Sequence, residues 1–140
     1  ATLDPDARID AILAWSALPG ASRHHWGTDI DVIDRAATAQ GYRPQLVPAE
    51  YAPGGVFHRL DAWLTASMSR FGFYRPYVRD LGGVRPEAWH LSHADSARPA
   101  CGGLTAEIMQ EAIESADIEG KERLIERMDE IRERYVVERQ

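Results

Sequence analysis

Apolar residues recur at helical spacing near the start of the chain. Three of them share one face of a helix with 3.6 residues per turn: Ile9, Ile12 and Leu13. Asp4 followed by Pro5 is a typical helix start, because an aspartate caps free backbone N–H groups and proline suits the first turn. The pattern therefore predicts a helix that begins after Asp4 and ends before the Pro-Gly pair at residues 19–20.

A second amphipathic pattern covers residues 57–68 and predicts a helix that stops at Gly72. Three shorter segments alternate in polarity or are rich in aromatic residues, as strands are: residues 28–34, 71–77 and 88–93. The link between the last two segments is short, so we expect them to pair antiparallel. Residues 35–55 and 94–103 are interrupted by proline and glycine, and both are expected to be irregular.

The last part of the chain is predicted to be helical, with Thr105 as a cap. Four apolar residues then recur at spacings of four, three and four: Leu124, Met128, Ile131 and Tyr135. This narrow seam is typical of helix-on-helix packing. We expect it to pack on the rest of the chain or against a second copy, which would give a homo-oligomer.

These elements predict an α+β fold, in which helices flank a small antiparallel sheet. The 140 residues fit a single domain. We divide it into residues 1–103, which hold the sheet, and a helical extension over residues 104–140.

The net charge of −6 is concentrated near the C-terminus, where residues 105–140 carry 11 acidic and six basic side chains. This balance argues against sequence-independent nucleic-acid binding, which needs a basic face. No apolar run is long enough for a membrane span, and no secretion leader is visible at the start. The single cysteine excludes an internal disulfide.

Candidate chemistry lies in two short segments, Ser-Arg-His-His-Trp-Gly-Thr-Asp-Ile-Asp at residues 22–31 and Glu-Ala-Trp-His at residues 87–90. A catalytic zinc site needs three protein ligands and an open position. His24, Asp31 and His90 supply two nitrogens and one oxygen, and Glu87 remains as a base. Gly27 permits a turn that lets His24 reach from a loop while Asp31 reaches from a strand.

Together the two motifs resemble the zinc peptidase group named for lysostaphin, D-alanyl-D-alanine peptidases and Sonic hedgehog. The Glu-x-Trp-His form is most similar to the D-alanyl-D-alanine carboxypeptidase branch, and the aromatic segment before it also matches. The resemblance covers residues 20–93. It implies that His24, Asp31 and His90 bind Zn²⁺, and that Glu87 is the general base that takes a proton from the zinc-bound water.

Other residues near the motifs are candidates for contacts with substrate or with the ligands. Ser22 matches the motif serine, and Trp89 is expected to form a wall of the site. Asp29 stands where the family often has alanine, and we expect it to orient a ligand histidine. His93 is a candidate substrate contact, with a polar strand end as the alternative.

The family usually carries an arginine well upstream of the first motif, where it stabilises the transition state. The 21 residues before Ser22 contain no such segment. We therefore expect the chain to be truncated at its N-terminus relative to the family, or to use another cation such as Arg23 or Arg75.

The resemblance implies a zinc-dependent carboxypeptidase that hydrolyses the D-alanyl-D-alanine bond of peptidoglycan stem peptides, in the periplasm or cell envelope. An L-alanyl-D-glutamate endopeptidase of the same group is the first alternative. A zinc-bearing module that binds without catalysis is the second.

Overall fold

The computed structural model describes residues 3–138 and has a three-stranded antiparallel sheet with the order β1-β3-β2. Its strands are β1 (Asp29–Asp31), β2 (Phe73–Tyr74) and β3 (His90–His93). Each strand lies inside a predicted segment but is shorter than predicted. The α+β class and the antiparallel pairing of β2 with β3 are confirmed.

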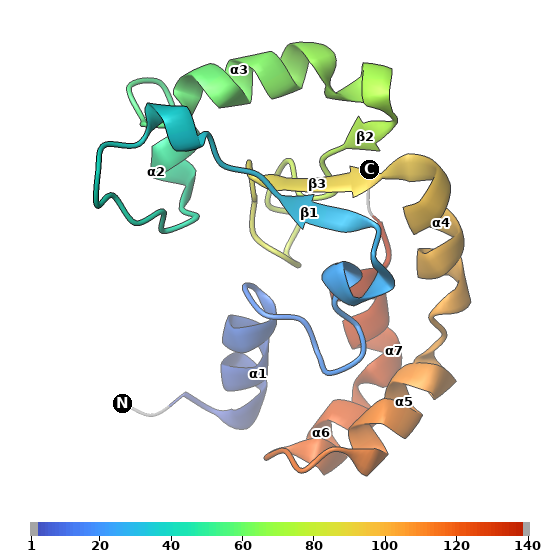
Figure 1. Ribbon diagram of the computed structural model, residues 1–140. Coiled ribbons are helices and arrows are strands. Elements are labelled where there is room, and N and C mark those ends of the chain that lie inside the picture. The colour runs from blue at the N-terminus through green and yellow to red at the C-terminus, as the bar shows by residue number, and fades with distance from the viewer. Residues whose placement is uncertain (1–2, 139–140) are drawn as a thin grey trace.

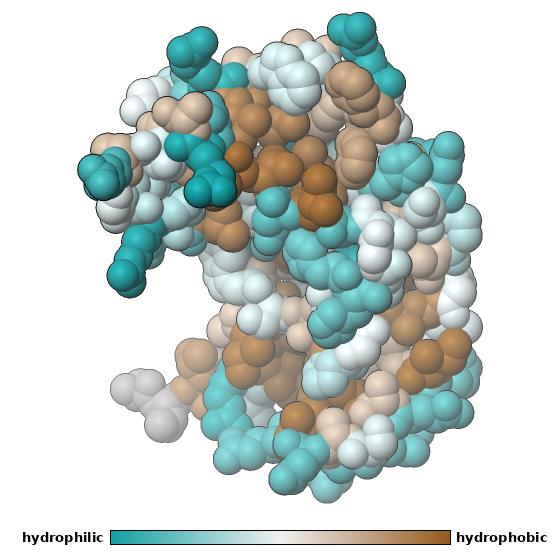
Figure 2. Space-filling view, in the orientation of Figure 1, coloured by the Kyte–Doolittle hydropathy of each residue, from teal (hydrophilic) through white to brown (hydrophobic). Residues whose placement is uncertain are grey.

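Helices lie at both ends of this sheet (Figure 1). Two helices, α2 (Pro48–Tyr51) and α3 (His58–Ser67), lie at one end. The other end carries the remaining helices: α1 (Pro5–Leu13), α4 (Ala94–Gly103), α5 (Ala106–Ser115), α6 (Lys121–Glu126) and α7 (Met128–Ile131). Figure 2 shows that the surface is hollowed between the end that carries α2 and the end that carries α1. No helix in residues 3–138 combines the length and the apolar character that crossing a bilayer requires.

The predicted helix starts after Asp4 and Thr105 and the stop at Gly72 are confirmed. The first helix ends earlier than predicted, at Leu13, and α2 forms within residues 35–55, which were predicted to be irregular. The Asp4 carboxylate accepts hydrogen bonds from the backbone N–H groups of Asp6 and Ala7. The Thr105 hydroxyl caps α5 by accepting from the N–H of Ile108. After α3, a 3₁₀ turn ends at Gly72, whose φ of 76° is the left-handed conformation that glycine adopts at low cost.

The prediction for residues 94–103 is wrong, because this stretch forms α4 and not a loop. Pro99 and two glycines suggested a break, and proline does disfavour a helix interior. Tertiary packing outweighs that preference here. Ala97 is fully buried, and the Arg98 guanidinium lies over the Tyr74 ring, 5.7 Å from its centroid.

The C-terminal seam packs inside the chain. The main core cluster joins α1, α5, α6 and α7 and contains nine buried residues: Leu13, Leu18, Ala21, Met109, Ile113, Leu124, Met128, Ile131 and Val136. The last seam position is Val136 and not Tyr135, because residues 132–136 form a π-helical turn that shifts the register by one. The buried seam residues are therefore not available for the contact with a second copy that the sequence left open.

We expect Ile113→Ala to lower the free energy of unfolding by about 2–5 kcal/mol, since Ile113 is fully buried and its truncation leaves a cavity. Ile108→Ala on the same helix is the control. Ile108 is 49% exposed, so its truncation should change stability by less than about 0.5 kcal/mol. Urea denaturation measures both. Equal effects of the two substitutions would contradict this account of the core.

Candidate metal centre

Three candidate ligands come together at one end of the paired strands β1 and β3. His24 lies on the 3₁₀ turn η1 (Arg23–Trp26), which ends at Gly27 with a φ of 73° and leads into β1. Asp31 is the last residue of β1 and lies directly opposite His90, the first residue of β3. His24 Nε2 is 3.5 Å from Asp31 Oδ2, and His90 Nδ1 is 3.5 Å from Asp31 Oδ1. One ligand atom from each residue lies within 4.8 Å of the others.

The three residues fit a zinc ion by type, and two of the separations between their atoms match a tetrahedral site. Zinc favours tetrahedral sites made from imidazole nitrogen and carboxylate oxygen. With metal–ligand bonds of about 2.0–2.2 Å, neighbouring ligand atoms in a tetrahedron are about 3.3–3.6 Å apart. The two 3.5 Å separations fall in that range. The side chains of His24 and Asp31 are 41% and 33% exposed, so solvent and ions can reach the group.

Both imidazoles are oriented by Asp29. His24 Nδ1 is 3.2 Å from the Asp29 backbone oxygen, and His90 Nε2 is 2.8 Å from the Asp29 carboxylate. If each of these nitrogens carries the proton, the other nitrogen of each ring presents a lone pair to the common centre. The predicted contact between Asp29 and a candidate ligand histidine is therefore present.

The Asp29 carboxylate is fully buried within a polar cluster. Thr28 Oγ1 and Ser92 Oγ donate to Oδ1 at 2.6 and 2.9 Å, and Arg23 Nε donates to Oδ2 at 2.8 Å. Burial by itself raises the pKa of this carboxyl. Hydrogen bonds with His90, Thr28 and Arg23 outweigh burial and hold the pKa of Asp29 well below its usual range. Asp29 is therefore an anion at neutral pH.

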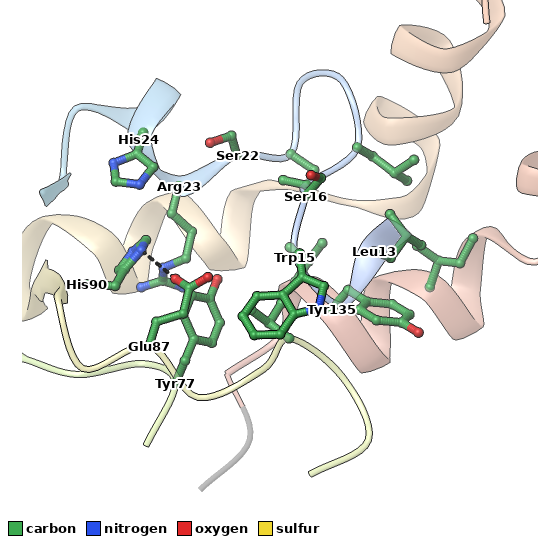
Figure 3. A pocket seen from close by; sticks show the side chains of 16 residues that line it. Leu13, Trp15, Ser16, Ser22, Arg23, His24, Tyr77, Glu87, His90 and Tyr135 are labelled. Atoms are coloured by element: carbon green, nitrogen blue, oxygen red, sulfur yellow. Dashed lines mark ion pairs between the residues drawn. The ribbon is translucent and has the colours of Figure 1, made fainter. Parts of the chain in front are cut away.

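Glu87 lies beside His90, as Figure 3 shows. The backbone N–H of His90 donates to the Glu87 carbonyl, so a single turn places both residues on one side of the chain. Glu87 Oε2 is 3.2 Å from His90 Nδ1. Burial lowers the pKa of His90, but the hydrogen bonds with Asp29 and Glu87 outweigh it and raise the pKa to about 9. The neighbouring carboxylates thus favour the protonated form of His90 in the metal-free protein.

A cavity of about 170 Å³ opens beside this group (Figure 3). Its polar end carries Ser22, His24, Glu87 and His90, and its walls come from both ends of the chain, including Trp15, Ile131 and Tyr135. Ser22, which the sequence singled out, therefore lies at the cavity.

The structure does not bring three of the predicted contact residues to the cavity. Trp89 is buried on the other side of its strand, where its ring packs 5.6 Å from that of Tyr51. His93 is three positions from His90 and so faces the opposite side, where it meets Phe73 and Ser96. Arg75 forms an ion pair with Asp61 at 2.8 Å.

Tyr77 and Tyr135 are among the cavity residues that were not identified from the sequence as site residues. The ring of Tyr77 lies edge-on to His90 with their centroids 5.1 Å apart, and burial raises the pKa of its hydroxyl. Tyr135, in the π-helical turn, packs against the edge of the main core cluster and also lines the cavity. The aromatic run before the second motif was a signal for Tyr77, whereas no local pattern marks Tyr135.

Comparisons with known proteins identify the family of the chain. The family model for the D-alanyl-D-alanine carboxypeptidase VanY matches residues 4–96. An uncharacterized protein of Haemophilus influenzae is 34% identical over 122 residues, which cover 86% of this chain and 93% of that protein. No solved structure shows a significant match.

We expect His24→Ala to weaken Zn²⁺ binding by more than the 10–100-fold that loss of an outer hydrogen bond typically costs, because it removes a direct ligand. The neighbouring His25→Ala is the matched control, since His25 is exposed and lies outside the ligand group. Competition with a fluorescent zinc chelator measures both affinities. Equal affinities for the two variants would contradict the ligand assignment.

Proposed function

This chain belongs to the D-alanyl-D-alanine carboxypeptidase family, and we propose that it is a zinc-dependent peptidase that removes the terminal D-alanine from peptidoglycan stem peptides. The observation that carries the proposal is the position of the Glu87 carboxylate, whose Oε2 lies 3.2 Å from Nδ1 of the candidate ligand His90. A family of peptidases implies a peptide substrate. We further propose that this substrate is a cell-wall peptide and that the protein acts in the periplasm or cell envelope.

His24, Asp31 and His90 would hold the ion. When bound, Zn²⁺ supplies Lewis acidity, which lowers the pKa of water towards about 7 and polarises the scissile carbonyl. Asp29 keeps both imidazoles turned towards the centre through the contacts described above. The contact between Asp29 and His90 is buried, which favours the fixed ligand geometry that catalysis requires.

Glu87 would move the proton. Its side chain is only 13% exposed, so the carboxylate is held at the centre and is not a freely solvated surface group. It takes a proton from the attacking water at Oε2 and later delivers it to the amine of the departing D-alanine. Retention of this carboxylate argues against a module that only binds zinc.

The size of the cavity suits a small terminal residue. Pockets for drug-sized ligands occupy about 300–1,000 Å³, and this one measures about 170 Å³. A side chain such as the methyl group of alanine needs little space, and the aliphatic wall favours it. The Ser22 hydroxyl at the polar end supplies a hydrogen-bonding group for the peptide.

One observation favours the alternative L-alanyl-D-glutamate endopeptidase. A carboxypeptidase must recognise a free carboxylate, usually with a cation. Arg23 is the only arginine that lines the cavity in the described part of the chain, and its guanidinium is engaged by Asp29, Tyr74 and Ser92. An internal peptide bond would need no such cation, so both bonds should be tested.

We expect the zinc-loaded protein to release D-alanine from a peptide that ends in D-alanyl-D-alanine, and Glu87→Gln to lower the rate by about 10²–10⁴-fold, since the amide cannot accept the proton. Glu111→Gln, at an exposed position on α5, is the control and should keep the wild-type rate. A peptide containing the L-alanyl-D-glutamate bond is assayed in parallel.

Cleavage of the second peptide alone would establish the endopeptidase alternative. Equal background rates for the zinc-loaded wild type and Glu87→Gln on both peptides would reject the catalytic proposal.

A further inference from the structure

The Arg23 guanidinium is buried directly behind the candidate metal centre. Its side chain is 3% exposed and donates three hydrogen bonds: Nε to Asp29 Oδ2 at 2.8 Å, and Nη2 to Ser92 Oγ at 2.7 Å and to Tyr74 Oη at 2.9 Å. It also lies over the Trp26 ring, 5.0 Å from the centroid. None of these partners is a candidate metal ligand, so the hydrogen bonds of the Arg23 side chain reach the ligands only through a second side chain.

Asp29 is the side chain that links Arg23 to the centre. Its Oδ2 atom is shared, because Arg23 Nε and His90 Nε2 both lie 2.8 Å from it. A buried carboxylate needs a compensating charge, and the planar guanidinium holds the carboxylate in a fixed orientation while it supplies that charge. The position of Oδ2 then sets the rotation of the His90 ring, and with it the direction of Nδ1.

The contacts of Arg23 continue to the C-terminal segment. Tyr74 on β2 accepts from Arg23, and its hydroxyl donates to Glu138 Oε2 at 2.9 Å. Glu138 lies more than 40 residues beyond the end of the family match at residue 96. The C-terminal segment thus contacts the hydrogen-bonded group that holds Asp29 in place.

We propose that Arg23 is a positioning residue for the metal centre: Arg23 and Asp29 act as one unit that fixes the His90 imidazole, and Tyr74 links this unit to Glu138. The proposal rests on the proposed metal site, because it concerns one of the ligands of that site. It assigns to Arg23, the only arginine that lines the cavity within residues 3–138, a role other than binding substrate. It also makes the C-terminal segment a support of the centre.

The test is a double-mutant cycle on metal affinity with Arg23→Met, Asp29→Asn and the double variant, each titrated with Zn²⁺ and with Co²⁺. Each single substitution should weaken binding by about 10–100-fold, the usual range for an outer hydrogen-bonding partner of a ligand. Because the two residues act as one unit, the double variant should bind each metal no more weakly than the single variant that has the lower affinity. If the two residues acted independently, the fold losses in affinity of the single variants would multiply in the double variant.

Two measurements distinguish a positioning role of Arg23 from a general effect on the stability of the protein. The visible absorption spectrum of the Co²⁺-loaded protein reports ligand geometry, and it should shift in Arg23→Met and return towards the wild-type spectrum in Arg23→Lys, which restores the charge. Tyr74→Phe, which removes only the linking hydroxyl, should shift affinity in the same direction by a few-fold. Arg98→Met is the matched control, because Arg98 is exposed and lies over the Tyr74 ring without a contact to Asp29.

The outcomes distinguish this proposal from the proposed function. If the wild type binds neither metal, the metal site and the positioning role both fail. If the wild type binds metal and Arg23→Met keeps the same affinity and Co²⁺ spectrum, only the positioning role fails. If urea denaturation shows that Arg23→Met does not fold, the Arg23→Lys and Tyr74→Phe variants decide, and wild-type affinity and spectra in both would overturn the proposal.

Discussion

The antiparallel pairing of β1 with β3 is the constraint on which the candidate site depends. In this register Asp31 lies opposite His90, and Asp29 lies opposite Ser92. Alternate residues of a strand share one face, so both aspartates point to the side on which His90 and Ser92 also lie. A shift of the register by one residue would turn each carboxylate to the other face and disperse the group. The pairing of the two strands fixes the positions of Asp31 and His90, and the turn at Gly27 then brings His24 close to them.

Behind the ligand atoms lies a buried polar cluster, and this cluster explains why a small sheet can hold the site in place. The Asp29 carboxylate accepts hydrogen bonds from the hydroxyls of Thr28 and Ser92 and from the Arg23 guanidinium, so its buried charge is compensated. Networks of this kind stabilise one geometry only when each member has its partners. The helical core beneath, built from both ends of the chain, closes the cavity beside the cluster. The sheet therefore positions the charged side chains of the site, and the helices shape the cavity beside them.

The sequence was most informative where chemistry or local backbone conformation restricts the residue. The ligand candidates and Glu87 were predicted from the residue types of two short motifs and their resemblance to a peptidase family, and the caps at Asp4 and Thr105 follow from backbone N–H groups that need acceptors. Packing was harder to foresee. Trp89 lies in the core, α4 forms despite Pro99, and Tyr135 lines the cavity, because each depends on contacts with residues distant in sequence. Arg23 was considered only as a cation for catalysis, since a single sequence does not reveal that a charged motif residue is buried.

The central claim is that His24, Asp31 and His90 together hold one divalent ion next to Glu87. Crystals of the zinc-loaded protein, measured on both sides of the zinc absorption edge, test it most directly, because the anomalous signal locates the ion independently of the protein atoms. The account predicts a single strong peak bonded to His24 Nε2, His90 Nδ1 and an Asp31 oxygen at about 2.0–2.2 Å. A peak elsewhere on the protein, or no ordered ion at this group in zinc-saturated crystals, would contradict it.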